Sequence, residues 1–405
     1  MIKHCLSPCV TITAAKADND YKIPDKFQNG YFVLQHENKE SDYLINPTIH
    51  FFLQKFLLPH TLYEVIEGIK IELNTYSPEL DETCKTFFQF LVRKKILVEE
   101  GTEKINVSND PFFNTGDTID DMLVENILSL RGYVDIYQTI EKNTGAKYAV
   151  KCTNRNKMKD EYSFTVALAE LEREYLLLKR ASHIPNICKV ISFVKKAPEL
   201  AYICLEFING KSLNSHLKKT INITPEDVLQ IMEGILQPFA ALHNSKIIHG
   251  DIHSSNIIVS ENNVVKIIDL GFSRIAELEK DQLIKHGGVT FYMPPERINT
   301  TSVKKFAKAP DLRSDVYQIG LLLYLTLFNS LPFDGFIWEE LAENIKSTAV
   351  SFPQTTITGE ESEDKMTAMI AKCLSKEPTD RYVNAGAVYD DFKNNVLAKK
   401  ALVAN

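Results

Sequence analysis

The chain has 405 residues, of which 44% are hydrophobic and 24% are charged. This length predicts two or three compact units, and the composition is typical of globular domains, which excludes a largely disordered, collagen-like or coiled-coil chain. Acidic residues outnumber basic residues by 53 to 46, so the net charge of −7 excludes a generally basic surface for nucleic acid or anionic membranes.

The seven cysteines lie far apart in the sequence. Their spacing is neither that of a secreted disulfide scaffold nor that of paired zinc-binding motifs, and it leaves the role of Cys5 and Cys9 open. The longest strongly apolar run, Ile319 to Phe328, is half the length of the ~20-residue segment that spans a bilayer. We therefore expect a cytoplasmic protein without a membrane-spanning helix.

The first 25 residues are expected to form a flexible arm, and residues 26–105 a small domain. Two short strands and three helices are predicted there, with the strands over 30–34 and 42–47 and the helices beginning near Ile49, Thr61 and Ser77. Thr61 and Glu64 have the spacing of a capping box, and Pro78 is tolerated in the first turn of a helix. The closing strand ends at Gly101, and this order of elements predicts a winged-helix-like domain.

Residues 106–121 are rich in Asp, Asn, Gly and Pro and are predicted to be a linker. A larger unit is predicted over 122–400. Its first part, residues 122–205, combines short apolar strands with a charged helix around Phe164 to Lys179. Its second part, residues 206–400, is mainly helical. We therefore predict an α+β fold for this unit, behind the small N-terminal domain.

Two apolar runs of the larger unit lie on either side of a polar loop with candidate metal-binding and proton-accepting side chains. Asp251 and Asn256 lie in this loop, after Ile247-Ile248, and Asp269 follows the second run, Val264 to Ile268. A hairpin of these runs would bring the three side chains to one end. Magnesium prefers such oxygen ligands, and a second carboxylate without metal can accept a proton from a hydroxyl group.

These residues resemble the protein kinase superfamily. His249 to Asn256 matches the catalytic-loop pattern H-x-D-x-x-x-x-N, and Asp269-Leu270-Gly271 stands where the family has Asp-Phe-Gly. Further matches over about 122–398 follow in the family's order: Tyr148-Ala149-Val150-Lys151, Glu174, Leu205-Glu206-Phe207, Pro294-Pro295-Glu296, Asp315 to Gly320, and Arg381. The resemblance implies a bilobal protein-kinase-like fold with an N-lobe over 122–205 and a C-lobe over 206–400.

The resemblance also implies a use of ATP and Mg²⁺ in phosphoryl transfer. Asp251 would be the catalytic base, while Asn256 and Asp269 would bind the metal. Lys151, paired with Glu174, would bind the α- and β-phosphates. The nucleotide pocket would include Glu206 and Phe207, whose backbone contacts adenine in the family, together with Leu128, Arg131 and Val134.

The phosphate loop departs from the family's glycine-rich pattern. Ser129, Arg131 and Val134 stand at the three glycine positions, and only Gly132 lies nearby. Side chains restrict the close backbone approach that glycine permits, so nucleotide affinity and turnover are open questions. The Arg131 guanidinium is a candidate phosphate ligand in their place. Loss of catalysis would leave a nucleotide-binding pseudokinase scaffold, which is one alternative function.

The catalytic loop itself shows two further departures. Gly250 replaces the arginine through which many protein kinases sense activation-loop phosphorylation, so control by that route is not expected. His253 replaces a phosphate-binding lysine, and this loop resembles that of aminoglycoside and choline phosphotransferases, which makes a small-molecule phosphotransferase the other alternative. Gly288 to Glu296 instead resembles the substrate-docking segment of protein kinases and favours a Ser/Thr-type hydroxyl of a protein.

Residues of about 30–101 resemble PqqD-like domains, the peptide-recognition modules of enzymes that modify ribosomally made peptides. The resemblance includes Tyr43 to Pro47 and the helix order. It implies that a leader peptide adds as a strand to the edge of residues 30–34 and brings a precursor peptide to the kinase. Residues 1–110 contain 12 basic and 16 acidic residues, which disfavours nucleic acid as a partner.

Overall fold

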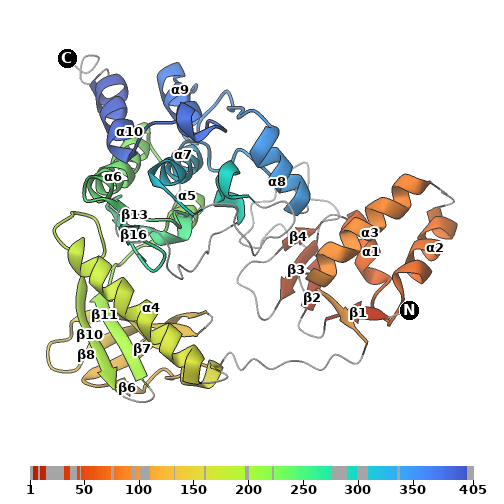
Figure 1. Ribbon diagram of the computed structural model, residues 1–405, viewed down its shortest axis with the longest axis horizontal. Helices are drawn as coiled ribbons and strands as arrows, with labels where there is room; N and C mark the ends of the chain where they lie inside the picture. Colours follow the sequence, from red (N-terminus) through yellow and green to blue (C-terminus); the bar gives the residue numbers. More distant parts are fainter. Residues whose placement is uncertain are drawn as a thin grey trace. The chain divides into compact units, whose positions relative to one another are not determined.

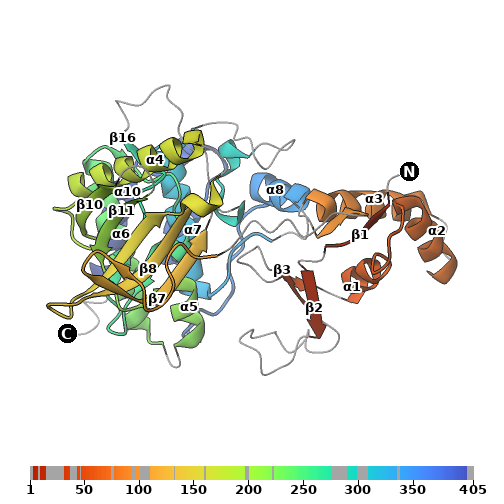
Figure 2. The same ribbon diagram turned by 90° about the horizontal axis from the view of Figure 1, so that it is seen from below.

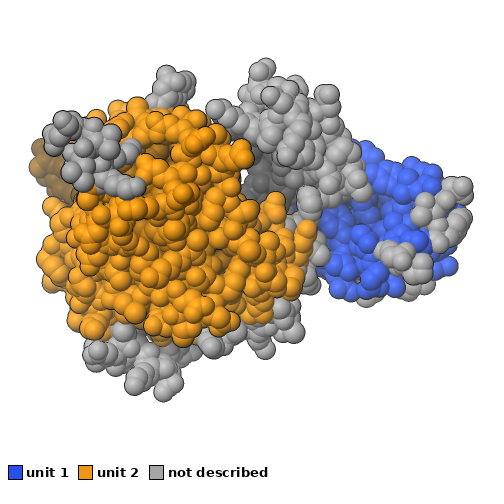
Figure 3. All heavy atoms as spheres, turned by 90° about the horizontal axis from the view of Figure 1, so that it is seen from above, with its two compact units in different colours: residues 1–109 blue, residues 110–405 orange. Residues whose placement is uncertain are grey.

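The computed structural model consists of two compact units, residues 1–109 and residues 110–405 (Figure 3). The residues that it describes are 3–7, 10–14, 32–36, 43–45, 47–73, 77–93, 96–100, 110–131, 133–158, 161–196, 200–220, 223–275, 290–298, 309–334 and 338–398. Each unit is described by itself below.

The first unit contains two antiparallel sheets and three helices (Figure 1). Its elements in chain order are β1 (His4–Leu6), β2 (Val10–Ala14), β3 (Phe32–His36), β4 (Tyr43–Ile45), α1 (Pro47–Gln54), α2 (Leu62–Leu73), α3 (Pro78–Arg93) and β5 (Leu97–Glu99). The capping box at the start of α2 is present, because Thr61 N donates to Glu64 Oε2 at 2.8 Å and Glu64 N donates to Thr61 Oγ1 at 3.2 Å. Buried side chains such as Leu53, Phe56 and Leu91 form the core of this unit.

The flexible arm expected over residues 1–25 needs correction. β1 pairs with β5, and β2 pairs with β3, so the described part of this segment belongs to the sheets. Val10 is buried and Ile12 packs against the same core, which is the alternation of a half-buried strand. The strand order β2-β3-β4 also places β3 in the centre, so the edge expected over 30–34 is paired on both sides. Cys5 lies in β1 as a free thiol, and Cys9 lies outside the described residues.

The N-lobe of the second unit is a six-stranded antiparallel sheet with one long helix, α4 (Glu161–Arg180) (Figures 1 and 2). The strand order is β10-β11-β9-β8-β7-β6, and α4 packs against β9, β10 and β11. The strands are β6 (Thr118–Ile119), β7 (Met122–Arg131), β8 (Val134–Glu141), β9 (Lys147–Thr153), β10 (Val190–Lys196) and β11 (Leu200–Glu206). A short 3₁₀ helix, η2 (Arg155–Lys157), lies between β9 and α4.

Residues 110–119, which we call the strap, are an ordered part of the N-lobe. The predicted linker over 106–121 and the domain start at 122 therefore need correction. β6 pairs with β7, and Ile119 is buried with Tyr137 and Cys152 on the face of the sheet opposite Lys151. Phe113 packs on this cluster, with its ring 5.9 Å from that of Tyr137. The strap gives an otherwise open face of the sheet a small hydrophobic core.

The Asp135 carboxylate joins the strap to the segment between β9 and α4, which contains Asn154 and η2. Asp135 is fully buried, and its Oδ1 lies 2.5 Å from Lys157 Nζ in η2. Its Oδ2 accepts from Phe112 N at 3.0 Å, from Tyr137 Oη at 3.0 Å and from Asn154 Nδ2 at 2.6 Å. Asn154 Nδ2 also lies 3.1 Å from the carbonyl oxygen of Asp110. A buried charge is tolerated when it is paired and hydrogen-bonded to this extent.

We expect Asp135→Asn to destabilise the kinase unit by about 3–5 kcal/mol, because the buried Lys157 ammonium would lose its counter-ion. Urea unfolding of the full chain measures the change. Asp121→Asn, at an exposed position of the β6–β7 turn, is the matched control. Equal unfolding midpoints for Asp135→Asn and the wild type would contradict the role of this buried ion pair.

The C-lobe is mainly helical and is built around α7 (Leu312–Phe328), which is buried on nearly all sides (Figure 1). A helix that is apolar all round is stable only inside a core. The other helices are α5 (Leu213–Lys219), α6 (Pro225–Asn244), α8 (Trp338–Ser347), α9 (Asp364–Cys373) and α10 (Ala385–Phe392). Within the described ranges, no helix is long and apolar enough to cross a membrane.

Short elements connect these helices and form the polar edge of the C-lobe. The short strands are β12 (Lys211–Ser212), β13 (Ile247–Ile248), β14 (Ile257–Val259), β15 (Val265–Ile267) and β16 (Arg274–Ile275). The 3₁₀ helices are η3 (Ser254–Asn256), η4 (Thr290–Tyr292), η5 (Pro295–Arg297) and η6 (Pro378–Asp380), and a π-helical turn, η7 (Lys393–Leu397), follows α10.

Candidate active site

The hairpin of β14 and β15 brings the two predicted metal ligands together. Ile257 pairs with Ile267, so Asn256, just before β14, lies at the same end as Asp269, just after β15. The backbone confirms this proximity, since Ile268 N donates to the carbonyl oxygen of Asn256 at 2.9 Å. Asn256 Nδ2 in turn donates to the carbonyl oxygen of Asp251 at 3.0 Å. Local pairing thus gathers the three side chains that the sequence singled out.

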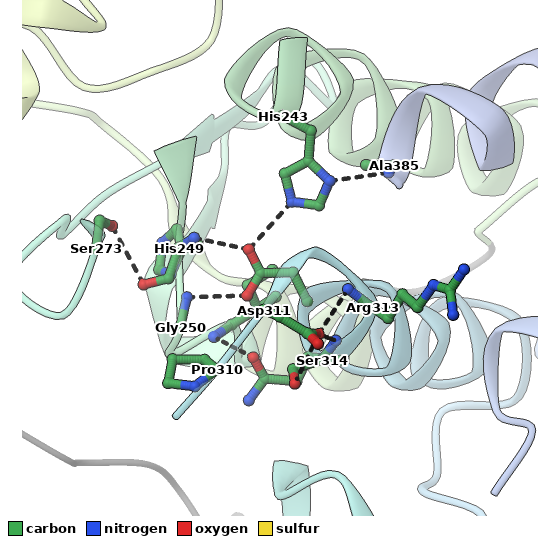
Figure 4. Close-up of polar contacts among 12 residues, drawn as sticks. His243, His249, Gly250, Ser273, Pro310, Asp311, Arg313, Ser314 and Ala385 are labelled. Carbon is green, nitrogen blue, oxygen red and sulfur yellow. Dashed lines mark hydrogen bonds and ion pairs between the residues drawn. The ribbon is translucent and has the colours of Figure 1, made fainter. Parts of the chain in front are cut away.

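The Asp315 carboxylate in the first turn of α7 holds the catalytic loop. It accepts from His249 N at 2.6 Å and from Gly250 N at 2.9 Å; in Figure 4 this carboxylate has no label of its own, and dashed lines join it to His243, His249 and Gly250. His243 Nε2 lies 3.1 Å from Asp315 Oδ2, and the other ring nitrogen of His243 accepts from Ala385 N at 2.9 Å. Burial opposes the negative charge of Asp315, but the hydrogen bond and attraction of His243 outweigh it and lower the pKa.

Two further side chains fix the loop and were missed by the sequence analysis. Gln318 Oε1 accepts from Ile252 N at 3.1 Å, and Gln318 Nε2 donates to the carbonyl oxygen of Tyr292 at 3.1 Å. The buried Arg297 donates from Nη1 to the carbonyl oxygen of Gly250 at 3.1 Å. The signal for Gln318 was available, because Asp315 and Gln318 lie three residues apart in an otherwise apolar helix and so share one face.

Lys151 on β9 lies between the two acidic groups expected near the phosphates. Its Nζ is 2.7 Å from Glu174 Oε2 and 3.4 Å from Asp269 Oδ2. Burial disfavours its charge, but the attraction of Asp269 and Glu174 is stronger and raises the pKa of Lys151. α4 therefore brings Glu174 to Lys151 on β9. The Lys151 ammonium group stays protonated beside Asp269.

The residues present fit a magnesium ion bound together with phosphates. Asp269 has a φ of 69°, and its Oδ1 accepts from Gly271 N at 2.8 Å. Burial opposes its charge, but Lys151 nearby outweighs this and lowers the pKa of Asp269, as a metal-binding carboxylate requires. The Asp269 carboxylate and the Asn256 amide oxygen are the kind of oxygen ligands that magnesium takes together with phosphate and water.

The oxygen Asp251 Oδ1 is buried and has no hydrogen-bond partner among the described residues. An acceptor of this kind fits a hydroxyl group of a substrate. His253 lies beside it, with Nε2 at 3.6 Å from Asp251 Oδ2 and Nδ1 accepting from Ser255 N at 3.3 Å. His249 packs edge-on against Phe239, with ring centroids 5.6 Å apart, and its Nδ1 accepts from Asp251 N at 3.4 Å.

The register of the N-lobe sheet shows which residues share a face with Lys151. Ile136 is directly opposite Lys151, and the alternation of strands adds Val134 and Ala149 to this face. Val134 was predicted, whereas Ile136 was missed. Leu128 lies at a bulge of β7 and is 48% exposed. Arg131 pairs with Val134 through the backbone, and the side chain of Arg131, like Gly132, lies outside the described residues.

The connector between the lobes begins at the end of β11. Glu206 Oε1 lies 2.6 Å from Lys266 Nζ and accepts from Lys189 N at 2.9 Å. The Glu206 side chain is therefore bound by other residues of the protein. Glu206 N donates to the carbonyl oxygen of Lys189 at 2.9 Å, so the carbonyl oxygen of Glu206 is the backbone group that could contact a nucleotide. Leu205 lies opposite Ala149, on the face that carries Lys151, and Phe207 follows β11 directly.

Comparison with known proteins identifies the family of this chain. The pattern of the protein kinase domain matches residues 132–392. The chain belongs to the protein kinase family. ATP and Mg²⁺ are the usual phosphoryl donor and cofactor of this family.

Several curated kinases are similar to this chain. The probable serine/threonine-protein kinase PknB of Lactococcus lactis subsp. lactis is 26% identical over 262 residues, which are 64% of this chain and 39% of that protein. The probable serine/threonine-protein kinase PknB of Bifidobacterium longum is 27% identical over 278 residues, 66% and 38% of the two chains. Serine/threonine-protein kinase pkn3 of Myxococcus xanthus is 26% identical over 278 residues, 65% and 48% of the two chains. The matched region thus covers less than half of each of these three relatives.

A buried ion pair anchors η5 to the residues that follow η6. Arg381 binds Glu296 with two nitrogens, at 3.0 Å from Oε1 and 2.8 Å from Oε2, and Ser314 Oγ donates to Oε1 at 2.9 Å. Burial opposes the charge of Glu296, but the hydrogen bonds and attraction of Arg381 outweigh it and hold the pKa below the ordinary value of a glutamate. A bidentate pair of this kind fixes both orientation and distance.

We expect Glu296→Gln to destabilise the protein by about 3–5 kcal/mol at pH 7, since the buried Arg381 would lose its counter-ion. The folded-state pKa of Glu296 is lowered, so its contribution is complete above the ordinary pKa and is lost as the pH falls through the folded-state value. Urea unfolding from pH 7 down to pH 3 should therefore show a constant difference between variant and wild type down to about pH 5, and a shrinking difference as the pH falls below 4.5, the ordinary pKa of a glutamate. A difference that grows on acidification would contradict this assignment.

Proposed function

We propose that the chain is an ATP- and magnesium-dependent kinase that transfers the γ-phosphoryl group to a serine or threonine hydroxyl of a protein. The observation that carries the proposal is the position of Lys151, at 2.7 Å from Glu174 and 3.4 Å from Asp269, in a chain that matches the protein kinase domain. Asn256 and Asp251 lie on the adjoining loop. Charge neutralisation and alignment are what phosphoryl transfer requires of a protein.

Each side chain then has a defined task. Lys151, held by Glu174, binds phosphate oxygens, and Asp269 and Asn256 provide the protein's metal ligands. A bound Mg²⁺ neutralises phosphate charge. Asp251 orients the acceptor hydroxyl and takes its proton as the new oxygen–phosphorus bond forms and the bond between the γ-phosphorus and the ADP oxygen breaks.

The relatives favour a protein acceptor over a small molecule. All three that are named above are described as serine/threonine-protein kinases. The docking segment predicted over 288–296 is described from Thr290 onward, where Tyr292 and Met293 are buried in the C-lobe core and Gln318 binds the Tyr292 carbonyl oxygen. This packing supports a substrate platform attached to α7. A small-molecule phosphotransferase and a pseudokinase scaffold are the alternatives that activity measurements would reveal.

We propose in addition that the first unit, which includes the predicted domain of residues 26–105 together with β1 and β2, is a PqqD-like, winged-helix-like domain that binds the leader of a precursor peptide. The order β2-β3-β4, followed by three helices, supports this proposal. β3 is paired on both sides, so an added strand would pair with β2 or β4, at the outer edges of this sheet. Binding there would raise the effective concentration of the precursor at the kinase site.

We expect Asp251→Asn and Asp269→Asn each to lower phosphoryl transfer at least about a hundredfold, because the first removes the proton acceptor and the second a charged metal ligand. Transfer from γ-labelled ATP, by autophosphorylation or to a generic protein acceptor, measures the effect. Asp364→Asn, at the exposed start of α9, is the control and should keep full activity. Retained transfer in either site variant, with an unchanged unfolding midpoint, would refute these roles.

The peptide-binding proposal has its own test. A short open reading frame beside the gene would provide the candidate precursor, and the peptide that it encodes can be synthesised. We expect its leader to lower amide hydrogen exchange in residues 10–14 or 43–45, because a paired edge strand protects its amide groups. A scrambled peptide is the control. Binding without protection of either edge would refute strand addition.

A further inference from the structure

A small cavity, which we call the α6–α9 cavity, lies in the C-lobe where the start of α6, the end of α7 and the start of α9 meet. α7 packs on both of the other helices, and Figure 1 shows the three helices together. The residues that line the cavity are separate from those of the candidate active site. Its volume is about 40 Å³, which is the space of about three water molecules. The cavity therefore accommodates the end of one side chain and excludes a nucleotide.

The buried part of the cavity wall is apolar. It consists of Val228 and Leu229 from α6, Leu327 from α7 and Met366 from α9, all of which belong to the C-lobe core. Close packing in this core holds the four side chains in place. A group that fills the cavity must therefore present an aliphatic surface to this part of the wall.

A hairpin of residues 354–362, between α8 and α9, provides another wall of the cavity. Thr356 N donates to the carbonyl oxygen of Glu360 at 2.8 Å across the hairpin. Ile357 N donates to the carbonyl oxygen of Leu327 at 2.7 Å and so fastens the hairpin to the end of α7. The wall is thus already formed without an occupant, which lowers the entropic cost of binding.

Three carboxylates, those of Glu360, Glu361 and Glu363, lie on the exposed part of the wall. Residues 360–365 contain four acidic side chains and one basic side chain, Lys365. Within the described ranges, no lysine, arginine or histidine forms an ion pair with any of the three carboxylates. The backbone amides at the start of α9 contribute only about half a positive charge. A cationic group at the mouth of the cavity would therefore relieve the repulsion among these carboxylates.

The apolar wall and the acidic mouth together fit an arginine side chain. Its methylene groups can lie against the apolar wall while the guanidinium stays at the exposed mouth. A guanidinium forms paired hydrogen bonds with carboxylates, and the hydroxyl groups of Thr356 and Thr358, 2.8 Å apart in the wall, offer further acceptors. An inorganic cation would gain nothing from the apolar wall, and an aliphatic side chain would leave the carboxylates unpaired.

We propose that the α6–α9 cavity is a docking site for a partner protein, which inserts one arginine side chain from an exposed segment. The cavity is too small for more than one side chain, so the rest of the segment would lie on the surface around it. Binding at this place does not require nucleotide and does not depend on the proposed kinase function.

The test uses the full chain, labelled with ¹³C on the methyl groups of its seven methionines. The probe is the blocked peptide Ala-Ala-Arg-Ala-Ala, and Met366→Leu identifies the Met366 signal in the NMR spectrum. The control peptide carries citrulline, which has nearly the shape of arginine and no charge. We expect the arginine peptide to shift the Met366 signal in a saturable manner and to bind at least about tenfold more tightly than the citrulline peptide.

The acidic mouth is tested with the combined substitutions Glu360→Gln, Glu361→Gln and Glu363→Gln. We expect this variant to bind the arginine peptide at least about tenfold more weakly, with a thermal midpoint equal to or above that of the wild type, because like charges are removed. The matched control combines Glu261→Gln, Glu343→Gln and Glu377→Gln, at exposed positions outside the cavity, and should bind like the wild type.

Three results would overturn the proposal. The first is an unshifted Met366 signal, or equal binding of the arginine and citrulline peptides. The second is a shift by spermine at the same concentration as large as that by the peptide, which would assign the cavity to free polyamines. The third is a lowered thermal midpoint with unchanged peptide binding in the variant of the three glutamates, which would mean that these carboxylates serve the start of α9.

Discussion

The candidate site depends on one buried carboxylate. Asp315 accepts hydrogen bonds from two consecutive backbone amides of the catalytic loop, and His243 supports its charge from the other side. Asp315 is itself fixed, because Asp311 caps α7 by accepting from Arg313 N and Ser314 N (Figure 4). The loop that carries the proposed base is thus fastened to the most deeply buried helix of the C-lobe, where little movement is possible.

The opposite side of the site is less deeply anchored. Lys151 and Glu174 belong to the N-lobe, and they reach Asp269 through an ion pair and through the packing of α4 against the following turn. One side of the site is therefore fixed by the core, and the other is set by the position of one helix. This division is the arrangement expected of an enzyme in which alignment provides most of the catalysis.

The sequence was sufficient to predict that residues in short patterns lie close together, while their roles stay a proposal. Asp251, Asn256 and Asp269 lie within 20 residues of one another; a hairpin brings Asn256 and Asp269 together, and Asn256 is hydrogen-bonded to Asp251. Asp135 and Arg297 could not be assigned in this way, because their partners are far away in the chain and depend on how separate elements pack. The strand over 10–14 carried a local signal in its alternation, but its pairing with β3 depends on residues that follow about 20 positions later.

The strap has a consequence for how the catalytic part can be isolated. A fragment that begins at residue 132, where the family match starts, would lack β6 and β7 and would expose the aromatic surface around Tyr137. The Asp135 carboxylate would also lose the donor on Phe112. Such a truncated protein would expose an unpaired sheet edge and apolar surface, which promote aggregation. A fragment made for expression should therefore begin before Asp110.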